Sequence, residues 1–240
     1  MFYASIKTAT PADAKRCFAA LTLPFGGDPA CRWAWPEPHQ YLEAFPRFAQ
    51  AFGGNAFNIG TAFCHAGYSG VALWLLPGTR PDEESLIHVI KDTVAHRLKD
   101  AMFLMFQQMD SYHPREAHWH LPLIGVDPAH QGKGIGLALL DHALKKCDVQ
   151  KVPAYLEATS RRKVPLYERH GFVPLGSIQI ADSPPIVPTA RKPLLGEKPK
   201  GTRLLVLAED RTAYNPLGMF REGRKTKESV LTCLSNSSYL

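Results

Sequence analysis

The chain has 240 residues, a formal net charge of +6 and 45% hydrophobic residues. This length allows one α/β domain with a full core. No apolar run approaches the length of a membrane span, and the first residues lack the charged and then apolar pattern of a secretion signal. We therefore expect a cytoplasmic protein that contacts no membrane.

The positive charge is concentrated near the C-terminus. Residues 191–240 hold ten Lys and Arg against five Asp and Glu, whereas residues 1–190 hold eighteen against seventeen. We expect one domain over residues 1–193 and a basic, flexible extension over 194–240, in which only Arg203–Ala208 is strand-like. The even balance in the domain argues against a nucleic-acid surface. The five cysteines have no metal-ligand spacing, so we expect idle thiols and no metal.

The first half of the chain predicts two helices followed by two strands. Thr10 and Pro11 start a helix that should run to about Leu21, and Gly26–Pro29 breaks the chain. Aromatic residues three or four apart predict a helix over His39–Phe52. Asn58–His65 and Gly70–Leu76 read as antiparallel strands.

The second half predicts two further helices and then alternating strands and helices. Pro81 opens a helix with acidic residues in its first turn, and Met102–Tyr112 forms another. A strand starts near His118 and includes the apolar run Leu121–Val126. The later predicted strands are Val152–Glu157, Val173–Ile180 and Val187–Lys192.

Three alternating glycines, Gly132, Gly134 and Gly136, follow the strand Leu121–Val126 and precede an apolar-periodic helix. Glycines allow close backbone approach to a ligand, and a helix N-terminus favours negative charge. The segment therefore predicts a cradle for a phosphate or pyrophosphate.

Three kinds of glycine loop compete for this segment. A dinucleotide-binding loop would need glycine at Leu137, and a P-loop would need glycine at Asp127 and a hydroxyl at Gly134. The string Gln131–Gly136 instead resembles the pyrophosphate loop of GNAT acetyltransferases. A second GNAT-like block, Leu-Tyr-Glu-x-x-Gly-Phe, occupies residues 166–172.

The resemblance covers about residues 5–193 and is closest to the small-molecule branch that includes puromycin N-acetyltransferase. The strings shared with that branch are His113–Glu116, His130–Gly134, Val152–Glu157 and Pro165–Phe172. The resemblance implies an α/β (α+β) fold with a mixed, mostly antiparallel central sheet. It also implies helices on both faces and a sheet splayed at an acetyl-CoA cleft.

The same resemblance implies which residues bind acetyl-CoA. The pantetheine arm would lie along the backbone of Ile124, Gly125 and Val126. Ser160 stands where many members have a coenzyme-contacting asparagine, which weakens that contact. The pyrophosphate would be held by Gln131, Gly132, Lys133, Gly134, Ile135 and Gly136, with Lys133 either adding charge or remaining solvated.

The chemistry implied is direct attack by a primary amine in a ternary complex. Tyr167 occupies the position of the general acid, and its alternative role is to position its hydroxyl without proton transfer. His118 and His120 are candidate bases, because residues two apart on a strand share a side and arylalkylamine N-acetyltransferases show a similar pair. Their alternative is a structural histidine pair. Glu157 is a second candidate base or a structural ion pair, and a backbone N–H near Val126 would stabilise the oxyanion.

The expected acceptor is a small-molecule amine, and the expected assembly is a monomer or homodimer. Two alternatives stay open: a non-catalytic acyl-CoA-binding or sensing module, and a protein lysine or N-terminal acetyltransferase. Aromatic residues suited to an amine-bearing acceptor are Trp33, Trp35, Trp74, Phe103 and Phe106.

Overall fold

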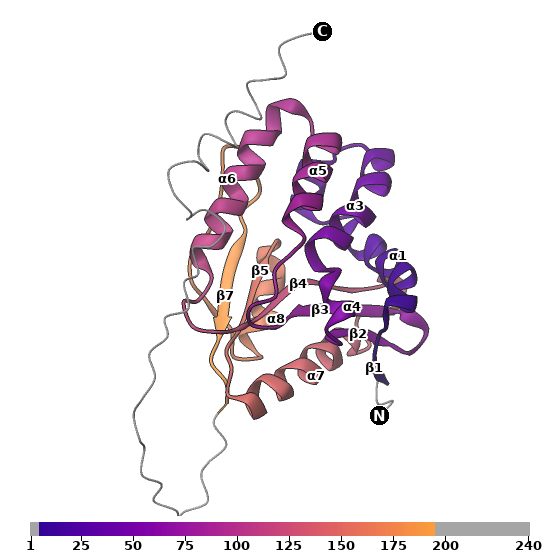
Figure 1. Cartoon of the computed structure of the whole chain (residues 1–240), viewed down its shortest axis with the longest axis vertical. Coiled ribbons are helices and arrows are strands. Elements are labelled where there is room, and N and C mark those ends of the chain that lie inside the picture. The colour runs from indigo at the N-terminus through magenta and orange to yellow at the C-terminus, as the bar shows by residue number, and fades with distance from the viewer. Residues whose placement is uncertain (1–4, 195–240) are drawn as a thin grey trace, which may run out of the picture.

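A computed structural model describes residues 5–194 of the chain. Its sheet has seven strands in the order β1-β2-β3-β4-β5-β7-β6 (Figure 1). Only β4 and β5 pair in parallel; the other neighbours are antiparallel. The predicted mixed, mostly antiparallel sheet is confirmed. The strands are β1 (Ile6–Thr8), β2 (Ala62–His65), β3 (Gly70–Leu75), β4 (Trp119–Val126), β5 (Ala154–Ala158), β6 (Val173–Pro174) and β7 (Val187–Arg191).

Helices cover both faces of the sheet, as predicted, with α3, α5 and α6 on one side and α7 on the other (Figure 1). No helix within residues 5–194 is both long enough and apolar enough to cross a bilayer. The helices are α1 (Ala14–Phe25), α2 (Pro29–Ala34), α3 (Pro38–Gly53), α4 (Asn55–Asn58), α5 (Glu83–Thr93), α6 (His96–Tyr112), α7 (Ile135–Gln150) and α8 (Val164–Glu168).

Strand β3 separates two hydrophobic cores. Val71, Leu73 and Leu75 join the core beneath α1, α3, α5 and α6. Ala72 and Trp74 join the core beneath α7 and α8. Successive side chains on a strand point to opposite faces, and β3 is buried along its whole length. A continuous apolar strand is therefore the sequence that a sheet covered on both faces requires.

The sheet opens between its two parallel strands. Strands β4 and β5 pair only through Trp119 with Ala154 and His120 with Tyr155. On the β3 side, Leu75 pairs with His120 and Leu73 pairs with Leu123, so Leu121 and Pro122 together oppose Trp74. This bulge bends β4 away from β5. The splay expected from the family resemblance is present, and it starts immediately after His120.

Two predicted strands are shorter in the structure. The segment predicted as Asn58–His65 starts inside helix α4, and β2 begins at Ala62. Ala56 and Phe57 just before it are fully or almost fully buried, and a short apolar run does not distinguish a helix from a strand. The predicted strand Val173–Ile180 forms only the two-residue β6, because regular pairing stops after Pro174 and resumes only through a bridge between Ile178 and Ile186.

Helix boundaries also differ from the prediction. Helix α1 continues past Leu21 to Phe25, and α6 starts at His96 rather than Met102. Helix α2 follows the predicted break, because the buried Asp28 side chain accepts hydrogen bonds from the backbone N–H groups of Ala30 and Cys31 and so caps a new helix. The predicted strand Arg203–Ala208 and the extension beyond Leu194 lie outside the described residues.

Candidate active site

The glycine loop has the conformation of an anion cradle. Gly132 and Gly134 have φ angles of +74° and +80°, which L side chains rarely adopt, and a Cβ on either would meet nothing within 4 Å. Gly134 is the N-cap of α7, a helix of 16 residues. The open space and the unpaired N–H groups of a helix start suit a phosphate group.

The edge of β4 next to this loop faces the gap beside β5. The N–H of Asp127 donates to the carbonyl of Ser69 at 2.9 Å, so this residue faces β3. Backbone groups alternate between the two edges of a strand, so those of Ile124 and Val126 point away from β3. The side-chain amide of Gln131 donates to the Val126 carbonyl at 3.0 Å. An edge of this kind can pair with an extended ligand arm.

A cavity between β4 and β5 continues this edge and ends at Tyr167. Its lining includes Pro122, Ile124, Glu157, Thr159 and Tyr167. Burial raises the pKa of Tyr167, and the carboxylate of Asp28 raises it further, so the phenol is protonated at neutral pH. We call this space the donor cavity. Ser160 follows Thr159 at the start of the turn before α8 and is not among the residues that line the cavity.

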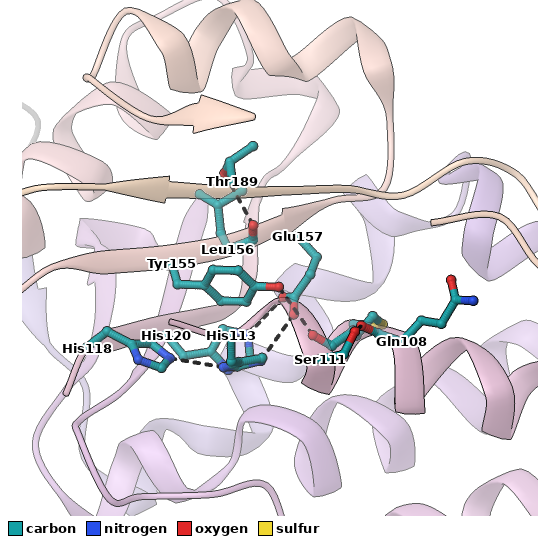
Figure 2. Close-up of polar contacts among 10 residues, drawn as sticks. Gln108, Ser111, His113, His118, His120, Tyr155, Leu156, Glu157 and Thr189 are labelled. Atoms are coloured by element: carbon teal, nitrogen blue, oxygen red, sulfur yellow. Dashed lines mark hydrogen bonds and ion pairs between the residues drawn. The ribbon is translucent and has the colours of Figure 1, made fainter. Parts of the chain in front are cut away.

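Three histidines and one glutamate meet on the face of the sheet that α6 covers (Figure 2). His120 on β4 contacts Glu157 on β5, with 2.9 Å between Nε2 and Oε2. His113, which follows α6, lies 3.3 Å from the second oxygen of Glu157 through its Nε2. His118 lies 3.0 Å from His113, joining Nε2 to Nδ1. The ring of Tyr155 packs against all three imidazoles. We call these four side chains, without Tyr155, the histidine cluster.

Burial controls the charges in this cluster. It lowers the pKa of His118 to about 4 and also lowers the pKa of His120, so both imidazoles are neutral at pH 7. Burial alone would raise the pKa of Glu157, but its contacts with His120 and His113 outweigh burial and lower it. A carboxylate whose side chain is only 4% exposed therefore keeps its negative charge.

A second pocket opens on the cluster from beneath α3 and α6. Phe52, Phe106 and Met109 form its apolar wall, and Asp110 and Glu157 contribute carboxylates. We call it the acceptor pocket. Phe106 is the one residue of the five predicted acceptor aromatics that lines it. Trp35 and Trp74 belong instead to the buried core, because indoles of this size are held by packing on both faces of the sheet.

Among the described residues, only Glu157 lines both the donor cavity and the acceptor pocket. Its oxygen Oε1 is buried and lies 3.3 Å from His113 Nε2, but it accepts no hydrogen bond from any residue of 5–194. A buried carboxylate oxygen without a partner is costly, so the site is arranged to receive a donor or a cation there. The two spaces and the carboxylate together can bring an amine next to an acyl donor.

The cluster also resembles a set of metal ligands in one respect. His113, His120 and Glu157 offer one donor atom each, and these atoms lie within 4.8 Å of one another. Imidazole and carboxylate groups can coordinate Zn²⁺ as well as share a proton. The expectation that no metal takes part in the reaction stays a prediction.

Sequence reasoning missed two residues of this site. His113 belongs to a sequence string shared with the small-molecule acetyltransferase branch, but the sequence assigns it no role. Its ring reaches the histidine cluster from the end of helix α6, which the sequence alone does not show. Asp28 lies 131 positions before Thr159, and its carboxylate accepts a hydrogen bond from the Thr159 hydroxyl. The Asp28-Pro29 helix start was visible in the sequence, but its position beside Tyr167 depends on tertiary packing.

Comparisons with known proteins agree with this geometry. A family model described as an acetyltransferase (GNAT) domain matches residues 93–174. An uncharacterized N-acetyltransferase of Schizosaccharomyces pombe is 26% identical over 188 residues, which cover 70% of this chain and 74% of that protein.

Two solved structures have the same fold. The structure described as histone acetyltransferase HPA2 and related acetyltransferase from Corynebacterium glutamicum aligns with a TM-score of 0.59 and 26% identity, covering 81% of this chain and 98% of that chain. Arylalkylamine N-acetyltransferase 2 from Aedes aegypti aligns with a TM-score of 0.55 and 12% identity, covering 78% of this chain and 98% of that chain. The second likeness shows the fold alone.

Proposed function

We propose that this chain, whose residues 93–174 match a family model described as an acetyltransferase (GNAT) domain, transfers the acetyl group of acetyl-CoA to a primary amine of a small molecule. The observation that carries the proposal is the position of Glu157, which lines both the donor cavity and the acceptor pocket. Two spaces that meet at one buried carboxylate suit a reaction in which both substrates are bound together.

The residues of the glycine loop and of β4 fit acetyl-CoA. The open space at Gly132 and Gly134 and the start of α7 would hold its diphosphate. The backbone groups of Ile124 and Val126 that face the gap would bind its extended arm. Acetyl-CoA supplies the thioester-bound acetyl group, and the donor cavity is where its reactive end would lie.

Two groups of this chain are placed to assist the acyl transfer. Tyr167 is protonated at neutral pH and can donate its proton to a leaving thiolate. Ile124 lines the donor cavity, and its N–H faces the gap between β4 and β5, so it can donate a hydrogen bond to a carbonyl oxygen there. Val126, near which the sequence predicts this donor, is not among the residues that line the cavity, and its role stays a prediction.

The charge of the acceptor pocket favours a cationic acceptor. Glu157 and Asp110 are acidic, and the one arginine of the lining, Arg80, lies 3.4 Å from Glu83 and is thereby paired. An ammonium group would find carboxylate partners at the inner end of the pocket and apolar contact with Phe52 and Phe106 along its wall. His118, His120 and Glu157 remain the candidates from the sequence for accepting the proton of that ammonium group.

A thiol-release assay tests this proposal. The full chain is incubated with acetyl-CoA and a panel of primary amines, including aminonucleosides and arylalkylamines, and free thiol and acetylated amine are measured together. We expect both products in equal amounts with at least one amine, and thermal stabilisation by acetyl-CoA alone.

The alternatives give different results in the same assay. Stabilisation by acetyl-CoA without turnover of any amine indicates an acyl-CoA-binding module. Transfer of labelled acetyl to lysines or N-termini of added proteins, with no small amine accepted, indicates protein acetylation. Either result would overturn the proposal of a small-molecule acceptor.

A further inference from the structure

The hydrogen bonds of the histidine cluster identify one atom for the proton of the amine. We infer that Nε2 of His113, a residue that the sequence motifs did not assign, takes the proton from the amine nitrogen. His118 is a positioning residue that fixes the orientation and tautomer of His113. The inference rests on the proposed acetyl transfer and goes further by naming the base.

The chain of hydrogen bonds starts at a backbone carbonyl. His118 Nδ1 lies 2.8 Å from the carbonyl oxygen of Glu116. A carbonyl only accepts hydrogen bonds, so His118 Nδ1 carries the hydrogen. Because the His118 ring is buried and neutral, its Nε2 has a free lone pair and can act only as an acceptor.

His113 is the donor to that lone pair. His113 Nδ1 lies 3.0 Å from His118 Nε2, so His113 Nδ1 carries a hydrogen. In the neutral ring, Nε2 of His113 is then a lone pair, and it faces Glu157 Oε1 at 3.3 Å. Two acceptors then face each other across this gap, and a proton taken up at His113 Nε2 would bridge them.

His120 is in the opposite situation. Its Nε2 lies 2.9 Å from Glu157 Oε2, and because a carboxylate accepts, that nitrogen holds the hydrogen. His120 therefore orients Glu157, and its Nε2 has no lone pair to offer to an amine. The Oε1 atom, which no described residue satisfies, lies on the His113 side.

His113 also has the better access to solvent. Its side chain is 22% exposed, against 9% for His120 and 4% for Glu157. His113 lines the acceptor pocket and can thus contact an amine directly. The charged and titratable groups that face it are Glu157, His118, His120, Tyr155 and Asp110.

The proton passes from the ammonium nitrogen to His113. The N–H bond of the ammonium breaks, its electron pair stays on the amine nitrogen for attack, and a new N–H bond forms at His113 Nε2. The resulting imidazolium is paired with the Glu157 carboxylate, and it loses the proton to solvent before the next turnover. No other reactant is needed.

The substitution His113→Gln tests the assignment, because glutamine keeps a polar side chain but cannot take up a proton. At saturating acetyl-CoA and amine, we expect kcat to fall about 100-fold, in the range of general-base catalysis, with the Kd for acetyl-CoA unchanged. His113→Ala should be partly rescued by added imidazole. His88→Gln, at an exposed position on α5, is the matched control and should keep kcat within about twofold of the wild type. A His113→Gln protein that binds acetyl-CoA and keeps its kcat would overturn the assignment.

A spectroscopic readout separates this inference from the proposed function. Nitrogen-15 NMR of the full chain reports which imidazole nitrogens carry hydrogens, with or without turnover. We expect hydrogens at Nδ1 of His113 and His118 and at Nε2 of His120. If the wild type acetylates no amine but shows this pattern, the acetyl-transfer proposal fails while the hydrogen-bond argument stands. A hydrogen at Nε2 rather than Nδ1 in neutral His113 would overturn the inference whatever the activity.

Discussion

Glu157 is held from two directions by histidines that lie on different segments. His120 precedes the bulge in β4 and His113 ends α6, whereas Glu157 lies where β5 has already separated from β4. The bulge and the separation leave the carboxylate accessible from the donor cavity and from the acceptor pocket. The chemistry of the site therefore depends on a local irregularity of the sheet.

Replacing Glu157 by glutamine should lower kcat/KM for the amine about 100-fold, which corresponds to about 2.7 kcal/mol of transition-state stabilisation. The amide keeps the size of the side chain but removes the charge that balances the ammonium and the imidazolium. Steady-state thiol release measures the effect. Glu84→Gln, which changes an exposed carboxylate on α5 outside the linings of both spaces, should change kcat/KM less than threefold. Equal effects of the two substitutions would contradict the assigned role.

Replacing Tyr167 by phenylalanine should lower kcat 10- to 100-fold and leave the Kd for acetyl-CoA within about threefold. The phenol is buried and protonated, and only its hydrogen is needed at the leaving sulfur. Tyr112→Phe, on α6 and outside the linings of both spaces, serves as the control. An unchanged kcat for Tyr167→Phe would leave this residue a packing role against Phe172.

At the scale of residues, the sequence offered His118, His120 and Glu157 as candidate bases, and the structure brings all three into the histidine cluster. Side chains two residues apart on a strand point to the same side, and this rule was sufficient to place His118 and His120 together. It was not sufficient for His113, because the position of a helix end relative to a sheet depends on packing of α6 against the core. The roles of all four side chains remain predictions.

Among the elements, the turn from β4 into α7 is the one whose backbone conformation matters most for the proposed function. Gly132 and Gly134 adopt positive φ angles with open space around them, which a ligand approaching the backbone requires and a packed turn does not. Ile135 and Leu139 anchor the helix in the core beneath the sheet. The loop is thus anchored at its helical end and has open space at Gly132 and Gly134.

The substitution Gly134→Glu should abolish binding of coenzyme A, because it adds a side chain and a negative charge where the diphosphate would lie. Isothermal titration calorimetry with coenzyme A measures the loss. Gly60→Glu is the matched control, since Gly60 has a φ angle of +70° and equally open surroundings but lies away from the loop. Retained binding in Gly134→Glu, or equal loss in both variants, would contradict the cradle.

Most elements could be predicted from the sequence, because their signals are local. The spacing of aromatic residues in α3 and the apolar run of β4 are examples. The predicted strand Asn58–His65 starts too early for a physical reason. The segment combines the end of α4 with β2, and the burial of the neighbouring Phe57 favours neither a helix nor a strand by itself. The splay between β4 and β5 was expected only from the family resemblance, and the position of the bulge at Leu121 and Pro122 was not predicted, since the register of β4 against β3 is a tertiary property.

At the scale of the whole molecule, α7 and β7 are joined by an ion pair. Arg191 is 3% exposed and donates two hydrogen bonds to Asp148, at 2.7 and 2.8 Å. Asp148 also accepts from the N–H of Leu194 at 2.7 Å. The pair fixes the last strand of the described chain to the helix whose other end forms the glycine loop.

Replacing Asp148 by asparagine should lower the free energy of unfolding by about 2 kcal/mol at pH 7, since it leaves the buried Arg191 without its charged partner. The hydrogen bonds from Arg191 lower the pKa of Asp148. A lowered pKa in the folded state stabilises the protein above the unfolded value of about 3.9, and this stability is lost as the pH falls through the folded value. The difference between wild type and variant should therefore shrink below about pH 4.

Urea unfolding at pH 7 and pH 3 measures both effects. Asp92→Asn removes a more exposed pair with Arg47 and should cost less than about 1 kcal/mol at pH 7. An Asp148→Asn variant no less stable than Asp92→Asn would show that the α7–β7 contact adds little to the stability of the fold.

The proposed function depends on the donor cavity and the acceptor pocket, which meet at Glu157 between β4 and β5. The most direct test is a crystal structure of the full chain with coenzyme A and an amine product identified by the thiol-release assay. The account predicts the diphosphate at Gly132–Gly136, the sulfur beside Tyr167 and the acetylated nitrogen beside Glu157. A coenzyme bound elsewhere, or an amine on the far side of the sheet from Glu157, would contradict it.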